Sequence, residues 1–302
     1  MAASRPVAMV TGGTRGIGKG ISEALADQGF DLLLGYGTNA EAAEAHAGEL
    51  RAKGVKVAII GGDVAKEETV DSYFEALAQE FPEQKLKALV HNAGQYVGIT
   101  SDNSLGLSSE GPRLLGSLLG EGGKVDLSLM DYYHQIYAKA WVRFVEKAVP
   151  LFTEGGSVVG ISSPGCNCTI NPAEGYDMPG SAKTVMETTA RYYAKNLAPK
   201  QITVNVVIPG LTESDAWKAL AKGKGKGSED HSMVQGLASK ACFMGRAQSA
   251  RELGNVVAFL CGPHSRYITG VALPVDGGLH LGRPLPLAPP AAKGGATPPP
   301  SQ

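Results

Sequence analysis

Short apolar runs alternate with amphipathic segments along the first 90 residues of the chain. The apolar runs are four to six residues long, and each leads into a segment that contains glycine; they occupy 7–10, 31–34, 55–60 and 86–90. Between them, residues 41–52 and 65–81 place apolar side chains at helical spacing. This alternation of strand and helix with short connections predicts parallel βαβ units.

The second half of the chain continues the alternation with longer helices. Strand patterns lie at 157–161, 202–208 and 271–275, and helical patterns lie at 130–152, 179–197 and 252–260. Together they predict an α/β fold, with one Rossmann-type domain and a doubly wound parallel sheet over residues 1–282. In such sheets, ligands bind at the carboxyl ends of the strands.

Three segments carry no clear periodicity. Residues 101–124 are rich in glycine, serine and leucine, which indicates a loop inserted near the mouth of the site. Residues 211–246 are polar and alternate lysine with glycine at 222–227, which indicates a flexible lid with solvated lysines. Residues 283–302 are rich in proline, and we expect a disordered tail there.

Composition and charge argue against several functional classes. The 302 residues carry a formal net charge of −1, so the chain has no overall field to attract nucleic acid or an anionic membrane. No apolar run approaches the roughly 18 residues of a membrane span, and we expect no signal or transit peptide. Four cysteines in a chain of this length indicate a reducing compartment, so we predict a cytoplasmic protein.

The glycine-rich turn T-G-G-T-R-G-I-G after the first strand has the chemistry of a dinucleotide site. Gly12 permits a tight turn, Gly16 lets a pyrophosphate approach the backbone, and Gly18 lets the helix pack close to the strand. The N-terminus of a helix there supplies free N–H groups and about half a positive charge. We therefore predict a cofactor site at this turn, with further contacts from Thr14, Arg15, Ile17, Tyr36, Asp63 and Val64.

The end of the second strand indicates which cofactor is used. An NAD-specific site places Asp or Glu there to bind the ribose 2′-hydroxyl, but residues 35–39 contain no carboxylate. Arg15 suits a 2′-phosphate, so we predict NADPH rather than NADH; a solvated loop arginine is the alternative. Asp63, after the third strand, suits the adenine amino group, the N-cap of the next helix, or both.

Several motifs in one order resemble those of the short-chain dehydrogenase/reductase family. They are the glycine turn, His91-Asn92-Ala93-Gly94 in place of N-N-A-G, Asn205 with Pro209-Gly210, and Tyr267-Ile268-Thr269-Gly270 with Asp276-Gly277-Gly278. The resemblance covers about residues 6–282 and implies NAD(P) chemistry on a small-molecule substrate in a homotetramer or dimer. It also implies cofactor contacts from Asn92, Ala93, Gly94, Pro209, Gly210 and Ser214, with Thr212 as an alternative to Ser214.

The catalytic residues depart from the family's usual spacing. The usual pair is Tyr-x3-Lys, whereas Tyr176 and Lys183 are seven residues apart, which resembles the divergent branch that contains enoyl-acyl carrier protein reductases. Ser163 precedes Tyr176 by thirteen residues, as the substrate-binding serine does in standard carbonyl reductases, and Ser162 is the second choice. The asparagine that the family often carries on its long helix aligns with Tyr137, so its relay role is not transferred.

The resemblance implies hydride transfer with a phenol as the proton donor. An ordinary phenol has a pKa near 10, so proton exchange near neutral pH requires roughly 4 kcal/mol of stabilisation of the phenolate. A helix terminus contributes about 0.3–1 kcal/mol, which leaves a nearby cation as the main cause. We predict Lys183 as that cation and as a ligand of the nicotinamide ribose, Tyr176 as the acid, and Ser163 as the residue that binds the substrate carbonyl.

These inferences predict an NADPH-dependent reductase of a ketone or 3-oxoacyl compound. Reduction of a conjugated C=C is the alternative reaction, and an NADP-binding protein with a non-redox or scaffold role is the alternative from another class. Cys166 and Cys168 have no evident partners for a tetrahedral site, so we expect them to line a pocket and expect no metal.

Overall fold

The computed structural model describes residues 5–95, 125, 127–152, 155–167, 172, 176–223 and 230–282. Within these residues, parallel strands form one seven-stranded sheet in the order β3-β2-β1-β4-β5-β6-β7. The strands are β1 (Val7–Thr11), β2 (Asp31–Tyr36), β3 (Val57–Gly61), β4 (Leu86–His91), β5 (Gly156–Ile161), β6 (Ile202–Pro209) and β7 (Ala272–Val275). The predicted doubly wound α/β fold is confirmed.

The direction in which successive strands are added reverses between β1 and β4. That reversal creates the crevice in which open α/β sheets bind ligands, at the carboxyl ends of the strands. The β1–β4 register pairs Thr11 with His91, so the glycine turn and the segment after β4 begin side by side. Both predicted motifs therefore lie at the switch point.

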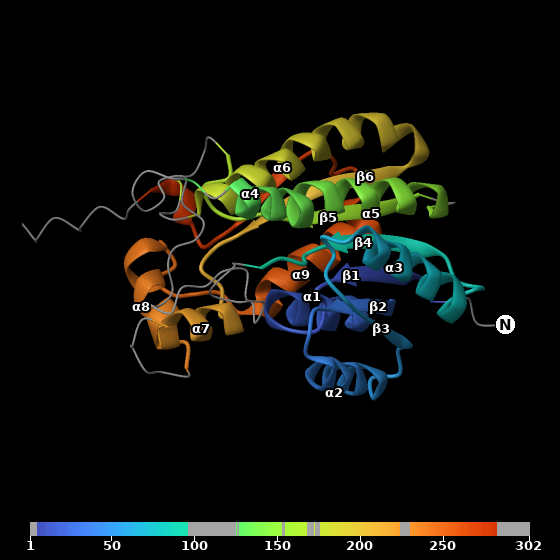
Figure 1. The fold of residues 1–302 in the computed structure, drawn as a ribbon, viewed down its shortest axis with the longest axis horizontal. Coiled ribbons are helices and arrows are strands. Elements are labelled where there is room, and N and C mark those ends of the chain that lie inside the picture. The colour runs from blue at the N-terminus through green and yellow to red at the C-terminus, as the bar shows by residue number, and fades with distance from the viewer. Residues whose placement is uncertain are drawn as a thin grey trace, which may run out of the picture.

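Two layers of helices cover the sheet (Figure 1). One layer consists of α1 (Gly16–Asp27), α2 (Ala40–Arg51) and α9 (Ala250–Cys261), and the other of α3 (Glu67–Glu80), α4 (Leu127–Tyr133), α5 (Ala140–Ala148) and α6 (Asp177–Leu197). Short 3-10 turns follow α5, α6 and α9 at Val149–Leu151, Ala198–Lys200 and Pro263–Ser265, and another lies after β7 at Leu279–Leu281. Each layer packs its apolar side chains against one face of the sheet, which is why the strands are apolar on both faces.

The long helix predicted at 130–152 is interrupted. Between α4 and α5 the chain forms a π-helical turn, His134–Lys139. A π-helical turn bonds each N–H to a carbonyl five residues earlier, and such turns are frequent at functional sites. Periodicity does not reveal this feature, because the apolar face continues through the turn with Ile136, Tyr137 and Ala138 buried.

The segment predicted to be a lid contains two helices among its described residues. It contains α7 (Asp215–Gly223) and α8 (Ser232–Ala241), which lie together beyond one end of the sheet, opposite the N-terminus (Figure 1). Buried Val234 and Ala238 give α8 a small apolar cluster of its own, against which Trp217 packs.

Some predictions fall outside the described residues. These are the insertion at 101–124, residues 224–227 of the lysine–glycine repeat, Cys168, and the tail at 283–302. Among the helices that are described, none combines the length and apolar character required to cross a bilayer.

Candidate active site

The glycine turn has the backbone that a pyrophosphate site requires. Gly12 and Gly16 have φ values of +62° and +52°, a region that side chains other than glycine rarely adopt. A Cβ at Gly18 would lie 1.9 Å from the carbonyl oxygen of Gly12, so the helix and the turn touch at that point. The tight turn predicted at Gly12 and the close packing predicted at Gly18 are both present in the backbone, and the approach of a pyrophosphate at Gly16 stays a prediction.

The N-terminus of α1 is open to an anionic ligand. Arg15, its N-cap residue, makes no capping hydrogen bond with its side chain, and the first turn contains no acidic residue. Gly16 lies against the start of the lid, since a Cβ on Gly16 would be 3.6 Å from that of Ser214. These residues fit the phosphates of a dinucleotide: free N–H groups, a bare backbone and a cation at the rim.

A cavity of about 440 Å³ lies beside this turn, lined by residues of α1, α2 and the lid. Arg15 and Ser214 both line it. Thr212 is 2% exposed, and its hydroxyl donates to the carbonyl of Gly210 at 3.0 Å while accepting from Gln248 at 2.8 Å. Of the two predicted alternatives, Ser214 is therefore the one whose hydroxyl borders the cavity.

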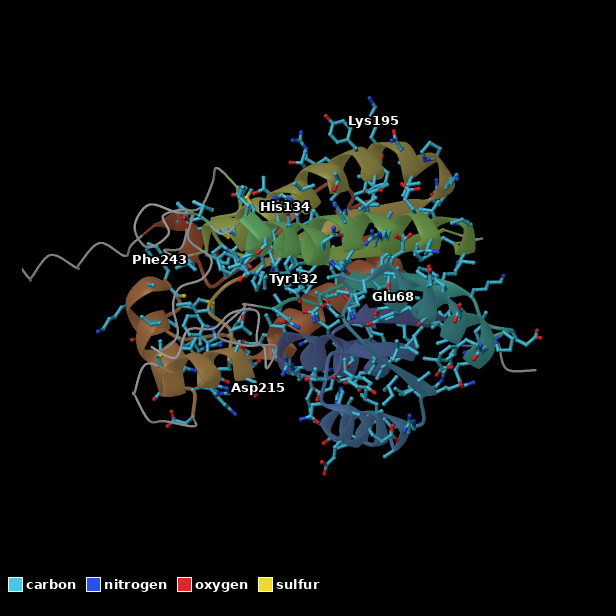
Figure 2. All side chains as sticks on the ribbon, in the orientation of Figure 1. Glu68, Tyr132, His134, Lys195, Asp215 and Phe243 are labelled. Atoms are coloured by element: carbon cyan, nitrogen blue, oxygen red, sulfur yellow. The ribbon has the colours of Figure 1, made fainter. Side chains whose placement is uncertain are left out.

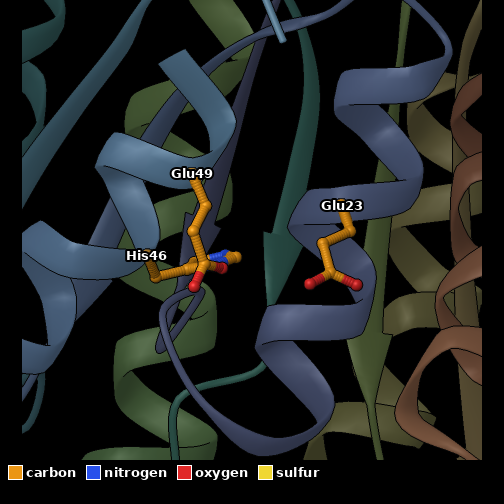
Figure 3. Close-up of side chains that lie close together, drawn as sticks. All are labelled: Glu23, His46 and Glu49. Carbon is orange, nitrogen blue, oxygen red and sulfur yellow. The ribbon is translucent and has the colours of Figure 1, made fainter. Parts of the chain in front are cut away.

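A cluster of two carboxylates and a histidine lines the same cavity (Figure 3). Potential ligand atoms of Glu23, His46 and Glu49 all lie within 4.8 Å of one another. Lys19 pairs with Glu49 at 2.8 Å, and the His46 ring bonds Ser22 Oγ at 2.8 Å and Glu49 at 3.3 Å. These contacts explain why His46 and Glu49 lie together without any ion.

Thr11 links the glycine turn to the segment after β4. Its hydroxyl oxygen accepts hydrogen bonds from the backbone N–H groups of Asn92 at 3.0 Å and Ala93 at 2.9 Å. The amide of Asn92 donates back to the carbonyls of Thr11 at 3.2 Å and Gly12 at 2.9 Å. Asn92 therefore positions the turn, in addition to the cofactor contact that the sequence predicts for it.

His91 stands where the family pattern has asparagine, and its ring lies next to the Thr11 hydroxyl of this network. Its Nε2 lies 3.2 Å from the carbonyl oxygen of Ile136, so Nε2 carries the proton and donates it. Nδ1 is then an acceptor and lies 3.4 Å from the Thr11 hydroxyl. Burial lowers the pKa of His91 to about 4, so the ring is neutral at physiological pH.

The neutral state of His91 makes folding dependent on pH. The unfolded chain binds a proton to His91 below about pH 6.5 and the folded chain binds it only near pH 4, so stability falls as the pH drops through this window. The free energy of unfolding should fall by about 3 kcal/mol on account of His91 alone. Denaturant titrations from pH 7 to pH 4 will measure this decrease.

His91→Asn is the matched control, because its amide offers a donor and an acceptor but does not titrate. The variant should lose about 3 kcal/mol less than the wild type over the same pH range. Burial also lowers the pKa of His46, which contributes to the slope in both proteins and cancels in the difference. Equal slopes in the two proteins would contradict a neutral, buried His91.

The three predicted catalytic side chains come together at the carboxyl end of β5 and the start of α6. The hydroxyls of Ser163 and Tyr176 are 3.1 Å apart, and the ammonium of Lys183 donates to Ser163 Oγ at 3.0 Å. Tyr176 is the N-cap residue of α6, one residue before the helix. The seven-residue spacing therefore brings both side chains to one serine.

The sequence did not reveal that Glu187 and Asn167 contribute hydrogen bonds next to this site. The carboxylate of Glu187, 8% exposed, accepts hydrogen bonds from the hydroxyl of Ser162 and from the amide of Asn167 at 3.0 Å. Ser162 is 1% exposed and donates to Glu187, which favours Ser163 over Ser162 as the predicted substrate-binding serine. Buried Cys166, whose carbonyl accepts from the Thr184 hydroxyl, belongs to the same loop.

The remaining predicted cofactor residues lie at the strand ends. Asp63 does not cap α3, whose N-cap residue is Lys66; it accepts from the N–H of Ala65 at 3.0 Å and from the Tyr132 hydroxyl at 3.3 Å. The cap prediction was wrong because α3 begins at Glu67, two residues later than the pattern indicated. Tyr36 packs against Gly61, and Val64 is buried.

Gly210 shows how tightly the end of β6 is packed. A Cβ on Gly210 would lie 2.5 Å from the Cα of Asp276, which belongs to the last predicted motif. Asp276 in turn accepts from the N–H groups of Gly278 at 3.0 Å and His280 at 2.9 Å. The motifs at Pro209-Gly210 and Asp276-Gly277-Gly278 thus support each other.

The chain is similar to known proteins over most of its length. A family model described as enoyl-(acyl carrier protein) reductase matches residues 12–280. The 3-oxoacyl-[acyl-carrier-protein] reductase FabG of Staphylococcus aureus is 30% identical over 91% of this chain and 98% of its own. The 1-cyclohexenylcarbonyl-CoA reductase of Streptomyces collinus is 29% identical over 93% of this chain and 89% of its own.

Solved structures are similar over the same range. L-sorbose reductase from Gluconobacter frateurii, complexed with NADPH and L-sorbose, superposes with a TM-score of 0.75, at 26% identity over 93% of this chain and 98% of that one. A blue fluorescent protein from a metagenomic library, in complex with NADPH, has a TM-score of 0.71 and 28% identity, covering 91% and 97%.

Proposed function

The chain belongs to the short-chain dehydrogenase/reductase family of NAD(P)-dependent oxidoreductases, and we propose that it uses NADPH to reduce the carbonyl group of a small ketone or 3-oxoacyl compound. The observation that carries this proposal is the meeting of the Ser163 and Tyr176 hydroxyls at 3.1 Å, with Lys183 beside them. Two hydroxyl donors at one point suit a single substrate oxygen that gains negative charge.

The chain's own residues supply binding and proton transfer. The glycine turn and the N-terminus of α1 would hold the pyrophosphate, and Arg15 the 2′-phosphate. The bound cofactor supplies the hydride. Tyr176 donates a proton to the substrate oxygen, Ser163 holds that oxygen with a second hydrogen bond, and the ammonium of Lys183 stabilises the phenolate left behind.

The preference for NADPH rests on charge at the adenosine end of the site. The side chain of Arg15 is exposed at the first residue before α1, and within the described residues it makes no ion pair. A 2′-phosphate would give it one, because arginine binds phosphate through paired N–H groups. Two structural relatives that are at least 26% identical are complexes with NADPH, which supports the same choice.

Reduction of an enoyl thioester is the second candidate. The Tyr-x6-Lys spacing favours it, and the names of the matching family model and of the Streptomyces collinus relative support it. In that reaction Tyr176 and Ser163 would stabilise an enolate oxygen rather than an alkoxide. We further propose that the lid at 211–246 closes over the substrate and that the protein is a homo-oligomer, a tetramer or a dimer.

A two-substrate panel tests the proposal. The purified protein, with NADPH, is given 3-oxoacyl thioesters and simple ketones in one series and enoyl thioesters in the other, and absorbance at 340 nm is followed. Turnover on the carbonyl series supports the proposal, and turnover confined to the enoyl series replaces it with the second candidate. Tight NADPH binding with no turnover on either series would favour a nucleotide-binding protein without a redox role.

Replacement of Arg15 tests the choice of cofactor separately. Arg15→Ala should raise the KM for NADPH about tenfold, because a charge-assisted hydrogen bond to phosphate contributes about 1.5–3 kcal/mol. The KM for NADH should change by less than about twofold, since NADH has no 2′-phosphate to lose the contact. An equal change for both cofactors would show that Arg15 acts on the glycine turn and not on the phosphate.

A further inference from the structure

We infer that Tyr137 is a positioning residue for Lys183: the face of its ring holds the Lys183 ammonium against Ser163, and His91 holds the turn that presents this ring. The inference rests on the proposed function, since it concerns the same site. Its test measures the chemical reactivity of the Lys183 amino group, which does not require turnover.

The ammonium of Lys183 is buried and has four neighbours within the protein. Its three protons correspond to three acceptors: the carbonyls of Ile161 and Ser162, each at 3.2 Å, and the hydroxyl of Ser163 at 3.0 Å. The ring of Tyr137 lies over the nitrogen, 4.8 Å from the ring centroid. Lys183 is 8% exposed, so the electron-rich face of the ring replaces water as its remaining neighbour.

The ring of Tyr137 is fixed in this place from three directions. It stacks on Tyr133, with centroids 6.1 Å apart and an angle of 8° between the planes. Its hydroxyl donates to the carbonyl of Gln95 at 2.6 Å. On a third side lies Gly94, where a Cβ would be 2.5 Å from the ring, so the glycine of the H-N-A-G motif makes room for Tyr137.

The phenol of Tyr137 is not a second acid in this site. Burial raises the pKa of Tyr137 well above its ordinary range, so the hydroxyl keeps its proton and acts as a donor to Gln95. The ring, and not the hydroxyl, is therefore the part that faces Lys183.

The helix presents this ring because the chain is π-helical there. Tyr137 lies in the turn His134–Lys139, and the residue before it, Ile136, accepts a hydrogen bond from His91 Nε2 through its carbonyl. His91 and Tyr137 both stand where the family pattern has asparagine, and the structure joins them across one peptide unit. The two residues that depart from the pattern therefore act together: His91 holds the π-helical turn, and Tyr137 in that turn contacts Lys183.

Chemical labelling of lysine tests this directly. The whole protein, without cofactor, is treated with a limiting amount of acetic anhydride at pH 8, and acetylation of Lys183 is measured by mass spectrometry. Lys195, an exposed lysine at the outer end of the same helix (Figure 2), is the internal reference. Tyr137→Leu should increase the labelling of Lys183 relative to Lys195 about tenfold, and Tyr137→Phe, which keeps the ring, should stay within about twofold of wild type.

A second pair of variants distinguishes the electrostatic effect of the ring face on Lys183 labelling from the effect of packing. Phenylalanine and 3,4,5-trifluorophenylalanine at position 137 have similar shapes, but fluorine weakens the negative face of the ring. The fluorinated protein should label Lys183 several-fold faster than Tyr137→Phe, with an unchanged far-ultraviolet circular dichroism spectrum and melting temperature. This pair remains informative if Tyr137→Leu does not fold.

His91→Leu tests the part of the inference that concerns His91, because it removes the hydrogen-bond donor to the carbonyl of Ile136. It should move Lys183 labelling in the same direction as Tyr137→Leu. Wild-type labelling in a folded Tyr137→Leu protein, or equal rates in the phenylalanine and trifluorophenylalanine proteins, would overturn the inference. These outcomes are independent of the proposed function, since a protein that reduces no carbonyl at all can still show the labelling difference.

Discussion

Tyr176→Phe is expected to lower turnover about 10³-fold, because it removes the proton donor and leaves the ring in place. NADPH affinity should stay within about twofold of wild type, since the glycine turn, Arg15 and Lys183 are untouched. Steady-state rates at 340 nm and a fluorescence titration with NADPH measure the two quantities on the same preparation. A loss in kcat with an unchanged Kd is the pattern of a group that acts in the transition state.

The matched control is Tyr192→Phe on the same helix. Tyr192 is 67% exposed, so loss of its hydroxyl should leave both turnover and cofactor affinity as in the wild type. Lys183→Met, in contrast, should impair turnover and NADPH binding together, because the ammonium is assigned to both. Near-normal turnover in Tyr176→Phe would remove Tyr176 as the acid, whatever the effect of Lys183→Met.

Gly18→Ala is expected to have the largest effect on the fold. The added Cβ would lie 1.9 Å from the carbonyl oxygen of Gly12, a backbone atom, and 2.7 Å from Asn92 Nδ2, which two hydrogen bonds to the glycine turn hold in place. The glycine turn must shift away from α1, at a cost of about 3 kcal/mol in the free energy of unfolding. NADPH affinity should fall at least about tenfold, since the same turn would hold the pyrophosphate.

Gly48→Ala tests whether this effect belongs to the turn. Gly48 lies in α2, and its added Cβ would meet no atom within 4 Å. Alanine is the better helix former by about 1 kcal/mol, so this variant should be more stable than the wild type. Chemical denaturation and NADPH titration of both variants provide the comparison, and a Gly18→Ala protein as stable as the wild type would contradict the close contact between α1 and the turn.

The three predicted catalytic residues show how far sequence motifs can predict a site. Ser163, Tyr176 and Lys183 were predicted from the resemblance to the family, and the structure brings Tyr176 and Lys183 within hydrogen-bonding distance of the Ser163 hydroxyl. Their chemical roles remain predictions for the variants above. The prediction succeeded because Tyr176 directly precedes α6 and Lys183 lies in that helix, so their relative positions depend on local structure.

Glu187 and His91 show what such patterns miss. A glutamate in the middle of a long helix is ordinarily a solvated residue, and Glu187 is buried only because Ser162 and Asn167 of a separate segment approach it. His91 was visible as a departure from the motif, but its partner Ile136 is 45 residues away along the chain. No local pattern encodes a contact of that length.

By itself, the sequence determined the alternation of strands and helices, the glycine turn and the residue types at the strand ends, because these depend on periodicity and on the backbone freedom of single glycines. Tertiary structure decided the rest: the π-helical turn, the helical lid, the burial of Glu187 and the contact of Tyr137 with Lys183. The physical reason is the same in each case. A buried polar or charged group is stable only with partners, and those partners come from segments that folding brings together.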